Sequence, residues 1–191
     1  GTEEHIIKGM YLCKPRSDSA DKGGAPRVQL LGSGSILRES IAAQELLLKD
    51  WGVAADVWSC PSFNQLARDG QDVARWNLLH PTEQQRVPFV TQQLEPHAGP
   101  VVASTDYMKN YVDQIRAFIP AGRSYTVLGT DGFGRSDFRY RLREHFEINR
   151  HYITVAALRA LADEGKVPMD RVSAAIKQYG IQADKINPLY A

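Results

Sequence analysis

Short apolar segments alternate with longer segments of helical periodicity, and this alternation constrains the fold more than any other feature of the sequence. Four apolar segments of four to eight residues are rich in strand-forming side chains: residues 28–31, 53–60, 101–104 and 125–128. Strands that alternate with helices predict a mostly parallel sheet with helices on both faces, because the crossovers are right-handed. The sequence therefore predicts an α/β fold.

The helices are predicted from apolar residues that recur every three or four positions. The stripe of the first, residues 36–50, consists of Leu37, Ile41 and Leu48. The stripe of the second, residues 105–118, consists of Tyr107, Tyr111, Ile115 and Phe118. The stripe of the third, residues 136–146, consists of Phe138, Leu142 and Phe146. Thr105 or Asp106 is expected to cap the second helix and Ser136 the third.

Two further helices close the chain. One begins after Asn149 and continues to Gly165, and the other has Val172, Ile176 and Tyr179 on one face. Ahead of the parallel strands, residues 6–13 predict an edge strand and residues 14–26 a mobile hairpin loop.

We therefore expect residues 1–191 to form one domain, a three-layer αβα sandwich. Its mostly parallel five-stranded sheet has one antiparallel edge strand, because the first strand enters through a hairpin. The chain begins at Gly1 without an initiator methionine, as expected for a piece of a longer protein, for a processed chain or for a cloned one.

The charge balance argues against nucleic acid and membrane surfaces as partners. A formal charge of +1 results from 23 basic and 22 acidic residues spread along the chain. No apolar segment approaches the roughly 20 residues of a membrane span, and the N-terminus does not look like a signal peptide. We expect a cytoplasmic protein with no nucleic acid or membrane partner.

Cysteines and histidines form no pattern that suggests metal or nucleophilic chemistry. Cys13 and Cys60 lack zinc-ligand spacing, and we expect reduced thiols, with Cys60 in the core. No HxH or HExxH spacing connects the five histidines, which are His5, His80, His97, His145 and His151. The spacing thus predicts no metal ligand and no catalytic cysteine or histidine.

Two glycine-rich turns follow predicted strands, where the ligands of open α/β sheets bind. The first, LLGSGS at residues 30–35, has Leu37 where a dinucleotide fingerprint places its third glycine, and it lacks the lysine of a P-loop. We interpret it as a turn whose small residues let strand and helix approach. The alternative is a free-standing nucleotide- or phosphate-binding module that uses the Gly32 and Gly132 turns.

The second turn, TDGFGRSD at residues 130–137, gathers more polar groups. In the structural interpretation, Asp131 orders the turn through backbone N–H groups, and Gly132 and Gly134 supply unusual backbone angles. Phe133 fills a neighbouring surface as a domain contact, and Ser136 caps the following helix. This interpretation assigns the turn no catalytic or cofactor-binding role.

Two functional interpretations of this region are disfavoured by the residues themselves. Asp131-Gly132 looks like the start of a thiamine diphosphate motif, but Asn149 is closer than the asparagine of that motif. Arginines alternate with aromatic residues between Arg135 and Arg150, as they do in some nucleic-acid-binding segments. Interspersed acidic residues instead favour a solvated or subunit-contacting helix face.

Five segments, taken together and in this order, carry a resemblance to a known family: IIKGMYL, VQLLGSGSILRE, RDGQDVARWNLLHP, ASTDYMKNYVDQIRAFIP and YTVLGTDGFGRSD. The chain resembles the C-terminal, transketolase C-terminal-like domain of homodimeric bacterial pyruvate dehydrogenase decarboxylating subunits, from about Glu4 to the final NPLYA. RWNLLHP and TDGFGRSD distinguish this family from transketolase. The chain departs from the family at Phe138, where relatives usually carry Ser or Thr, and in its long loop over residues 17–25.

The resemblance implies a domain with no catalytic residue of its own. Complete enzymes of this family use thiamine diphosphate and magnesium to decarboxylate pyruvate, and then acetylate the lipoyl group of dihydrolipoyl acetyltransferase. Their cofactor, metal and substrate residues lie in the other domains, so no cofactor is expected on this one. The implied partners are the remaining domains of the subunit, a homodimer partner and the acetyltransferase.

Overall fold

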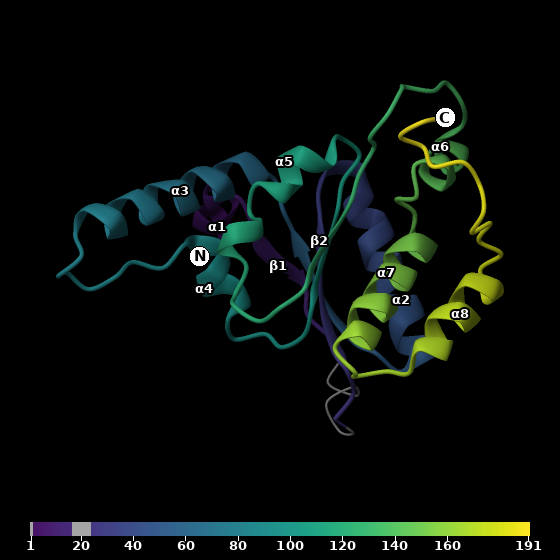
Figure 1. Cartoon of the computed structure of the whole chain (residues 1–191), viewed down its shortest axis with the longest axis horizontal. Helices are drawn as coiled ribbons and strands as arrows, with labels where there is room; N and C mark the ends of the chain where they lie inside the picture. The colour runs from purple at the N-terminus through teal and green to yellow at the C-terminus, as the bar shows by residue number, and fades with distance from the viewer. Residues whose placement is uncertain (1, 17–23) are drawn as a thin grey trace.

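The computed structural model describes residues 2–16 and 24–191, which form a five-stranded sheet between two layers of helices (Figure 1). The strands are β1 (Tyr11–Lys14), β2 (Arg27–Gly32), β3 (Ala54–Ser59), β4 (Val101–Ser104) and β5 (Tyr125–Leu128). Their order across the sheet is β1-β3-β2-β4-β5, with β1 antiparallel and the other four parallel. The predicted α/β sandwich with one antiparallel edge strand is confirmed.

The helices divide between the two faces of the sheet (Figure 1). One layer consists of α2 (Leu37–Trp51), α7 (Arg150–Asp163) and α8 (Met169–Gln178). The other consists of α1 (Thr2–Lys8), α3 (Phe63–Leu79), α4 (Phe89–Leu94) and α5 (Lys109–Asp113). The short α6 (Arg139–His145) follows β5 and precedes α7.

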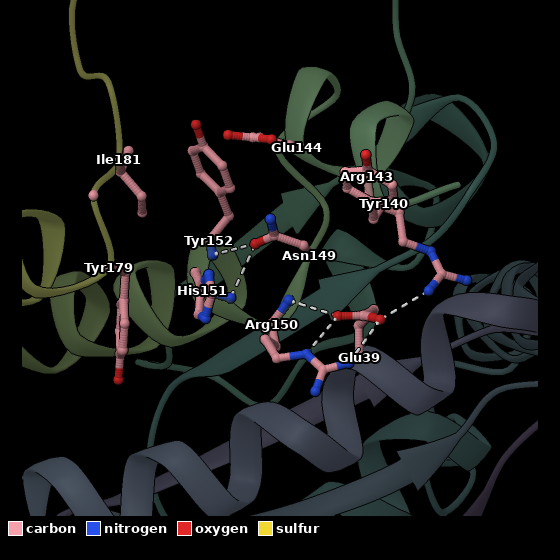
Figure 2. A pocket seen from close by; sticks show the side chains of 11 residues that line it. Glu39, Tyr140, Arg143, Glu144, Asn149, Arg150, His151, Tyr152, Tyr179 and Ile181 are labelled. Carbon is pink, nitrogen blue, oxygen red and sulfur yellow. Dashed lines mark hydrogen bonds and ion pairs between the residues drawn. The ribbon is translucent and has the colours of Figure 1, made fainter. Parts of the chain in front are cut away.

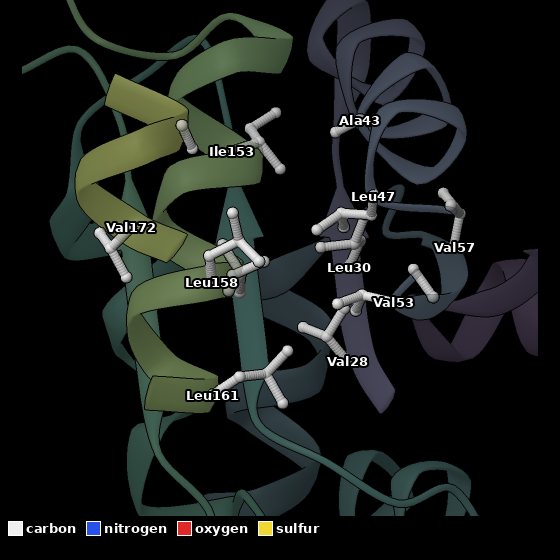
Figure 3. Packing of buried hydrophobic residues seen from close by; sticks show 14 of the residues in the cluster. Val28, Leu30, Ala43, Leu47, Val53, Val57, Ile153, Leu158, Leu161 and Val172 are labelled. Carbon is white, nitrogen blue, oxygen red and sulfur yellow. The ribbon is translucent and has the colours of Figure 1, made fainter. Parts of the chain in front are cut away.

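Alternating strand side chains supply the two hydrophobic clusters of the core. Val28 and Leu30 face α2 and α7, while Leu31 faces the opposite layer, because successive residues of a strand point to opposite faces. In Figure 3 the side chains of Leu47 on α2 and Leu158 on α7 point toward each other. This packing fixes both helices against the sheet.

The N-terminal segment differs from the expected strand. Residues 2–8 form α1, in which Lys8 pairs with Glu4 one turn earlier at 2.7 Å, and β1 begins only at Tyr11. Ile6 and Ile7 are both exposed, so the apolar pair does not mark a buried strand. The prediction of a strand over residues 6–13 is therefore wrong in its first half.

The connection after β1 is not a hairpin. β1 pairs with β3, with Tyr11 opposite Ser59, whereas the next strand in the chain is β2. The antiparallel edge is thus correct, but the predicted reason for it is wrong. Residues 17–23, which make up most of the predicted loop over residues 14–26, lie outside the described residues.

The predicted single helix over residues 105–118 is also wrong. This segment contains the five-residue α5 and a separate 3-10 turn at Arg116–Phe118. Thr105 and Asp106 do not cap α5, because their side chains accept hydrogen bonds from serines of the β2 turn. Tyr111 is exposed, and Val112 is buried in its place.

The remaining helices agree with the sequence patterns to different degrees. α7 begins after Asn149, whose side chain caps it as such a residue should. In α2, Leu47 is buried and Leu48 is exposed, so the expected stripe is wrong at Leu48. The patterns did not indicate α3 or α4, and the second half of α3, after Gly70, contains no buried residue.

The packing of the core predicts that alanine substitutions of two leucines differ strongly in their effect on the free energy of unfolding. Leu158→Ala, fully buried between α7 and the sheet, should reduce the free energy of unfolding by about 2–5 kcal/mol. Leu78→Ala, 77% exposed on α3, should change it by less than about 0.5 kcal/mol. Urea unfolding monitored by circular dichroism measures both, and similar losses in the two variants would contradict this packing.

Candidate functional site

The carboxyl ends of β2 and β4 mark the point where the direction of strand addition changes. From β2 the chain passes through α2 to β3 on one side, and then returns to β4 on the other side of β2. α2 covers one face of the sheet, and α5, which follows β4, lies on the opposite face (Figure 1). Open α/β sheets bind ligands at such switch points, so this edge is the candidate functional site.

Buried hydroxyl groups join the ends of these two strands. Ser33 Oγ donates to Thr105 Oγ1 over 2.8 Å, and the hydroxyl oxygens of Ser40 and Ser104 are 3.0 Å apart. Both pairs are shielded from water, so each hydroxyl needs a partner inside the protein, and Ser40 Oγ also donates to Ile36 O over 3.4 Å. The pairs hold the β2 turn and the start of α2 against β4.

Gly32 permits the close approach of α2 to β2. A Cβ atom at this position would be 2.7 Å from Ser40 Oγ and 2.9 Å from Leu37 Cα, and both distances are too short. The LLGSGS turn is therefore a packing feature, as predicted. Its exposed Ser35 points out of the turn and donates to Asp106 Oδ2 over 2.9 Å.

The second turn is tied to the segment that follows β4. Asp131 Oδ1 accepts the backbone N–H of Lys109 over 3.0 Å, and the Thr130 N–H donates to Tyr107 O over 3.0 Å. Thr130 Oγ1 donates to Asp106 O at the same distance. Asp131 thus binds the start of α5, whereas the sequence predicted that it would order its own turn.

Gly132 is the position of this turn that requires glycine. Its φ is 100°, and a Cβ atom would be 2.3 Å from Pro188 O, because the C-terminal residues cross the turn here. Gly134 has neither a positive φ nor any atom near the place of a Cβ. The prediction of unusual backbone angles is confirmed for Gly132 and wrong for Gly134.

The start of α6 differs from the prediction. The N-cap residue is Phe138 and not Ser136, and the Phe138 N–H donates to Asp137 Oδ1 over 2.7 Å. Phe138 is 73% exposed, so it does not belong to a buried stripe. Phe133 is 78% exposed and is not buried against any surface of the described chain.

A buried carboxylate behind these turns connects three helices (Figure 2). Glu39, in the first turn of α2, is 4% exposed and accepts from Arg143 Nη1 over 2.8 Å. It also accepts from the backbone N–H and Nε of Arg150, each over 3.0 Å. The sequence predicted a solvated or subunit-contacting face here, but these two arginines belong to an internal bridge.

The bridge favours the ionised form of Glu39. Burial by itself opposes ionisation, but hydrogen bonds from Arg150 and the charges of Arg150 and Arg143 outweigh it and lower the pKa of the carboxyl. Because the pKa is lower in the folded state, the bridge stabilises the fold at pH values above the ordinary value of 4.5. This contribution is lost as the pH falls through the folded-state pKa.

A pocket of about 460 Å³ adjoins this bridge. Figure 2 shows the side chains that line it. Its lining includes Tyr140, Tyr152 and Tyr179 beside Glu39 and the two bridging arginines. Asn149 is occupied as the cap of α7, since its Oδ1 accepts the N–H groups of the next two residues over 3.0 and 3.2 Å. Glu39 and Asn149 are therefore occupied by structural contacts.

The described residues do not form a metal centre. Across residues 2–16 and 24–191, no three or more His, Cys, Asp or Glu side chains are grouped so as to hold a metal ion. Cys60 is fully buried, as predicted, and its burial raises the pKa of the thiol. Within the same residues no helix is both long enough and apolar enough to cross a membrane.

A known domain family matches most of the chain. The family described as "Transketolase-like TK C-terminal domain" matches residues 9–149, and the chain belongs to it. Among curated proteins, the chain is 55% identical over 189 residues to the pyruvate dehydrogenase E1 component of Cupriavidus necator. It is 56% and 52% identical, over 191 residues, to the proteins of the same name from Haemophilus influenzae and Escherichia coli K12. These matches cover 99–100% of the chain and 21% of each relative, so the chain spans about a fifth of their length.

Solved transketolase structures share the fold at low sequence identity. Transketolase from Campylobacter jejuni superimposes with a TM-score of 0.52 and 19% identity, over 81% of this chain and 19% of that one. A split-gene transketolase, titled an inactive beta4 tetramer, gives the same TM-score with 13% identity, over 81% and 43% of the two chains. These likenesses concern the fold alone.

The Glu39 bridge predicts a pH-dependent loss of stability. Glu39→Gln should reduce the free energy of unfolding by about 1–3 kcal/mol at neutral pH, because two arginines lose a charged acceptor. The loss should shrink in acid, where the Glu39 carboxylate of the unaltered protein also becomes protonated.

Urea unfolding at several pH values measures this effect. The matched control is Glu45→Gln on the same helix, where the exposed carboxylate pairs with Lys14 at 3.1 Å and should contribute less than about 1 kcal/mol. An equal loss for Glu39→Gln at neutral and acidic pH would contradict the assignment.

Proposed function

We propose that this chain is the C-terminal assembly domain of a pyruvate dehydrogenase E1 component. The complete enzyme decarboxylates pyruvate and reductively acetylates the lipoyl group of dihydrolipoyl acetyltransferase. The observation that carries this proposal is the identity of more than half of the residues, over the whole chain, with proteins of that name. On this proposal the enzyme is cytoplasmic, in keeping with Cys13 and Cys60, which form no disulfide in the described structure.

The thiamine diphosphate and magnesium of such an enzyme do not fit the described residues of this domain. Magnesium with a diphosphate needs several oxygen ligands around one point, but Asn149 Oδ1 is occupied as the cap of α7, and the described residues contain no group of three or more His, Cys, Asp or Glu side chains that could hold a metal ion. Asp131, the closest match to a cofactor motif, is 3.8 Å from Lys109 Nζ and also accepts that residue's N–H. We therefore assign the cofactor, the metal and the catalytic groups to the remaining domains.

The exposed aromatic residues of the second turn are suited to bind those domains. Phe133 and Phe138 are both largely exposed, and Phe138 stacks with the exposed Tyr140 at 6.1 Å between ring centres. Exposed Met108 and Tyr111 follow the neighbouring strand β4. Large apolar side chains gathered at one edge are typical of a surface that another part of a protein covers.

α3 and the residues after it offer a second contact surface. The end of α3 extends away from the sheet in Figure 1, and Leu78 at this end is largely exposed. Arg86 lies 3.9 Å from the centre of the Trp76 ring and forms two hydrogen bonds with Asn77, so the returning segment is held on the helix. A rigid apolar projection of this kind suits contact with a homodimer partner or another domain.

The exposed charges of α6 are suited to a weaker partner. Arg141 and Glu144 are exposed and 3.8 Å apart, and Arg139 is exposed on the same helix. Charged surfaces of this kind form salt-sensitive contacts, so we assign this helix to docking of dihydrolipoyl acetyltransferase.

A chimera tests the proposed function. The chain should replace the matching fifth of the Cupriavidus necator pyruvate dehydrogenase E1 component without loss of pyruvate decarboxylation. The same enzyme with this region deleted should be inactive, because its remaining domains lose the contact surface. Full activity of the deletion variant, or an inactive chimera that is folded, would contradict the proposal.

Two substitutions in the chimera test the contact surface. Phe133→Ser with Phe138→Ser should lower activity about tenfold or more, because two aromatic anchors would leave the interface. The control is Met169→Ser, which changes an exposed apolar residue at the start of α8 and should leave activity within about twofold.

A further inference from the structure

A cavity of about 310 Å³ lies between the two glycine-rich turns and α6. Ser35 and Asp106 line it from the ends of β2 and β4, and Thr130 lines it from the turn after β5. The cavity is therefore at the switch point of the sheet, where the strand ends leave room for a ligand. Its other polar lining consists of three arginines, Arg135, Arg139 and Arg143.

We propose that this cavity binds a small phosphate-bearing anion through Arg135 and Arg139. This ligand site goes beyond the assembly role proposed above, although it shares the second turn and α6 with that surface, and titration of the chain alone tests it separately. The planar guanidinium group offers paired N–H donors whose spacing matches two phosphate oxygens. Two such groups lining one cavity suit an anion with adjacent phosphate oxygens better than a single carboxylate.

The three arginines differ in what they already bind. Arg143 donates to Glu39 over 2.8 Å and to Ser35 Oγ over 3.4 Å, so its charge is largely compensated inside the protein. Arg135 and Arg139 form no hydrogen bond or ion pair with residues in the described part of the chain. Their donors are available to a ligand.

The charge balance of the cavity favours an anion. Asp106 is its only acidic lining residue among those described, and its Oδ2 already accepts from Ser35. Glu39, behind the lining, pairs with both Arg143 and Arg150, so Arg135 and Arg139 leave the cavity with an excess of positive charge over Asp106. This excess attracts anions at low ionic strength.

The floor of the cavity strengthens that attraction. Ile36 and Ile148 are buried, and Leu142 and Phe146 are partly buried, so apolar groups lie behind the arginines. Charges interact more strongly next to apolar groups than in open water. Because the described residues hold no metal-binding group, the anion should bind without magnesium, unlike a thiamine diphosphate site.

Calorimetric titration of the chain with pyrophosphate, at low salt and with a chelator present, tests the proposal. We expect saturable binding in the absence of magnesium, with an affinity that falls as salt is added. Arg135→Ala with Arg139→Ala should weaken binding at least tenfold, since each removes charge-assisted hydrogen bonds. Arg135→Lys with Arg139→Lys should give an intermediate loss, because the charge stays and the paired donors do not.

The matched control removes two exposed arginines from α3, by Arg68→Ala with Arg75→Ala. It should change the affinity less than twofold. Thermal unfolding of every variant checks that it is folded. If the double alanine variant is unfolded, the double lysine variant still tests the proposal. No saturable heat below about 10 mM pyrophosphate, or equal losses in the site and control variants, would overturn the proposal.

Discussion

The buried carboxylate of Glu39 holds together the parts of the molecule that surround the candidate site. It lies at the start of α2, directly after the β2 turn, and binds Arg143 of α6 and the first residue of α7. A carboxylate in the first turn of a helix is also favoured by the helix dipole. The bridge thus fixes α6 and the start of α7 against the start of α2.

At this edge of the sheet, Glu39 and the paired hydroxyl groups are buried, whereas aromatic side chains are exposed to solvent. Inside, Ser33 and Ser40 bind the end of β4 and leave no reactive group free. Outside, Phe133 and Phe138 remain exposed, beyond Thr130 and Asp131, which are hydrogen-bonded to the segment after β4. Exposed aromatic residues next to such an anchored point have the properties of a contact surface.

The sequence predicted the parallel strands well because each is a short apolar segment between turn residues. The boundaries of β4 and β5 agree with the predicted ones. The errors occur where burial depends on distant partners: Thr105 and Asp106 look like helix caps, but serines about 70 positions away bind them. α1 was missed because adjacent Ile6 and Ile7 look apolar in sequence, although neither enters the core.

The candidate site could be located from the sequence, but its chemistry could not. Glycine-rich turns after strands correctly indicated the edge of the sheet. No sequence pattern indicated the role of Glu39, since its partners Arg143 and Arg150 are 104 and 111 positions away. Ser136 has a residue type that suits an N-cap, but the backbone places Phe138 at that position.

Hydrogen exchange tests most directly the claim that this chain is an assembly domain whose contact surface is the second turn. Exchange of backbone amides is measured on the chain alone and within the complete chimeric enzyme. The account predicts that residues 129–138 exchange more slowly in the complete enzyme, because the remaining domains cover Phe133 and Phe138. Unchanged exchange across those residues in an active chimera would contradict it.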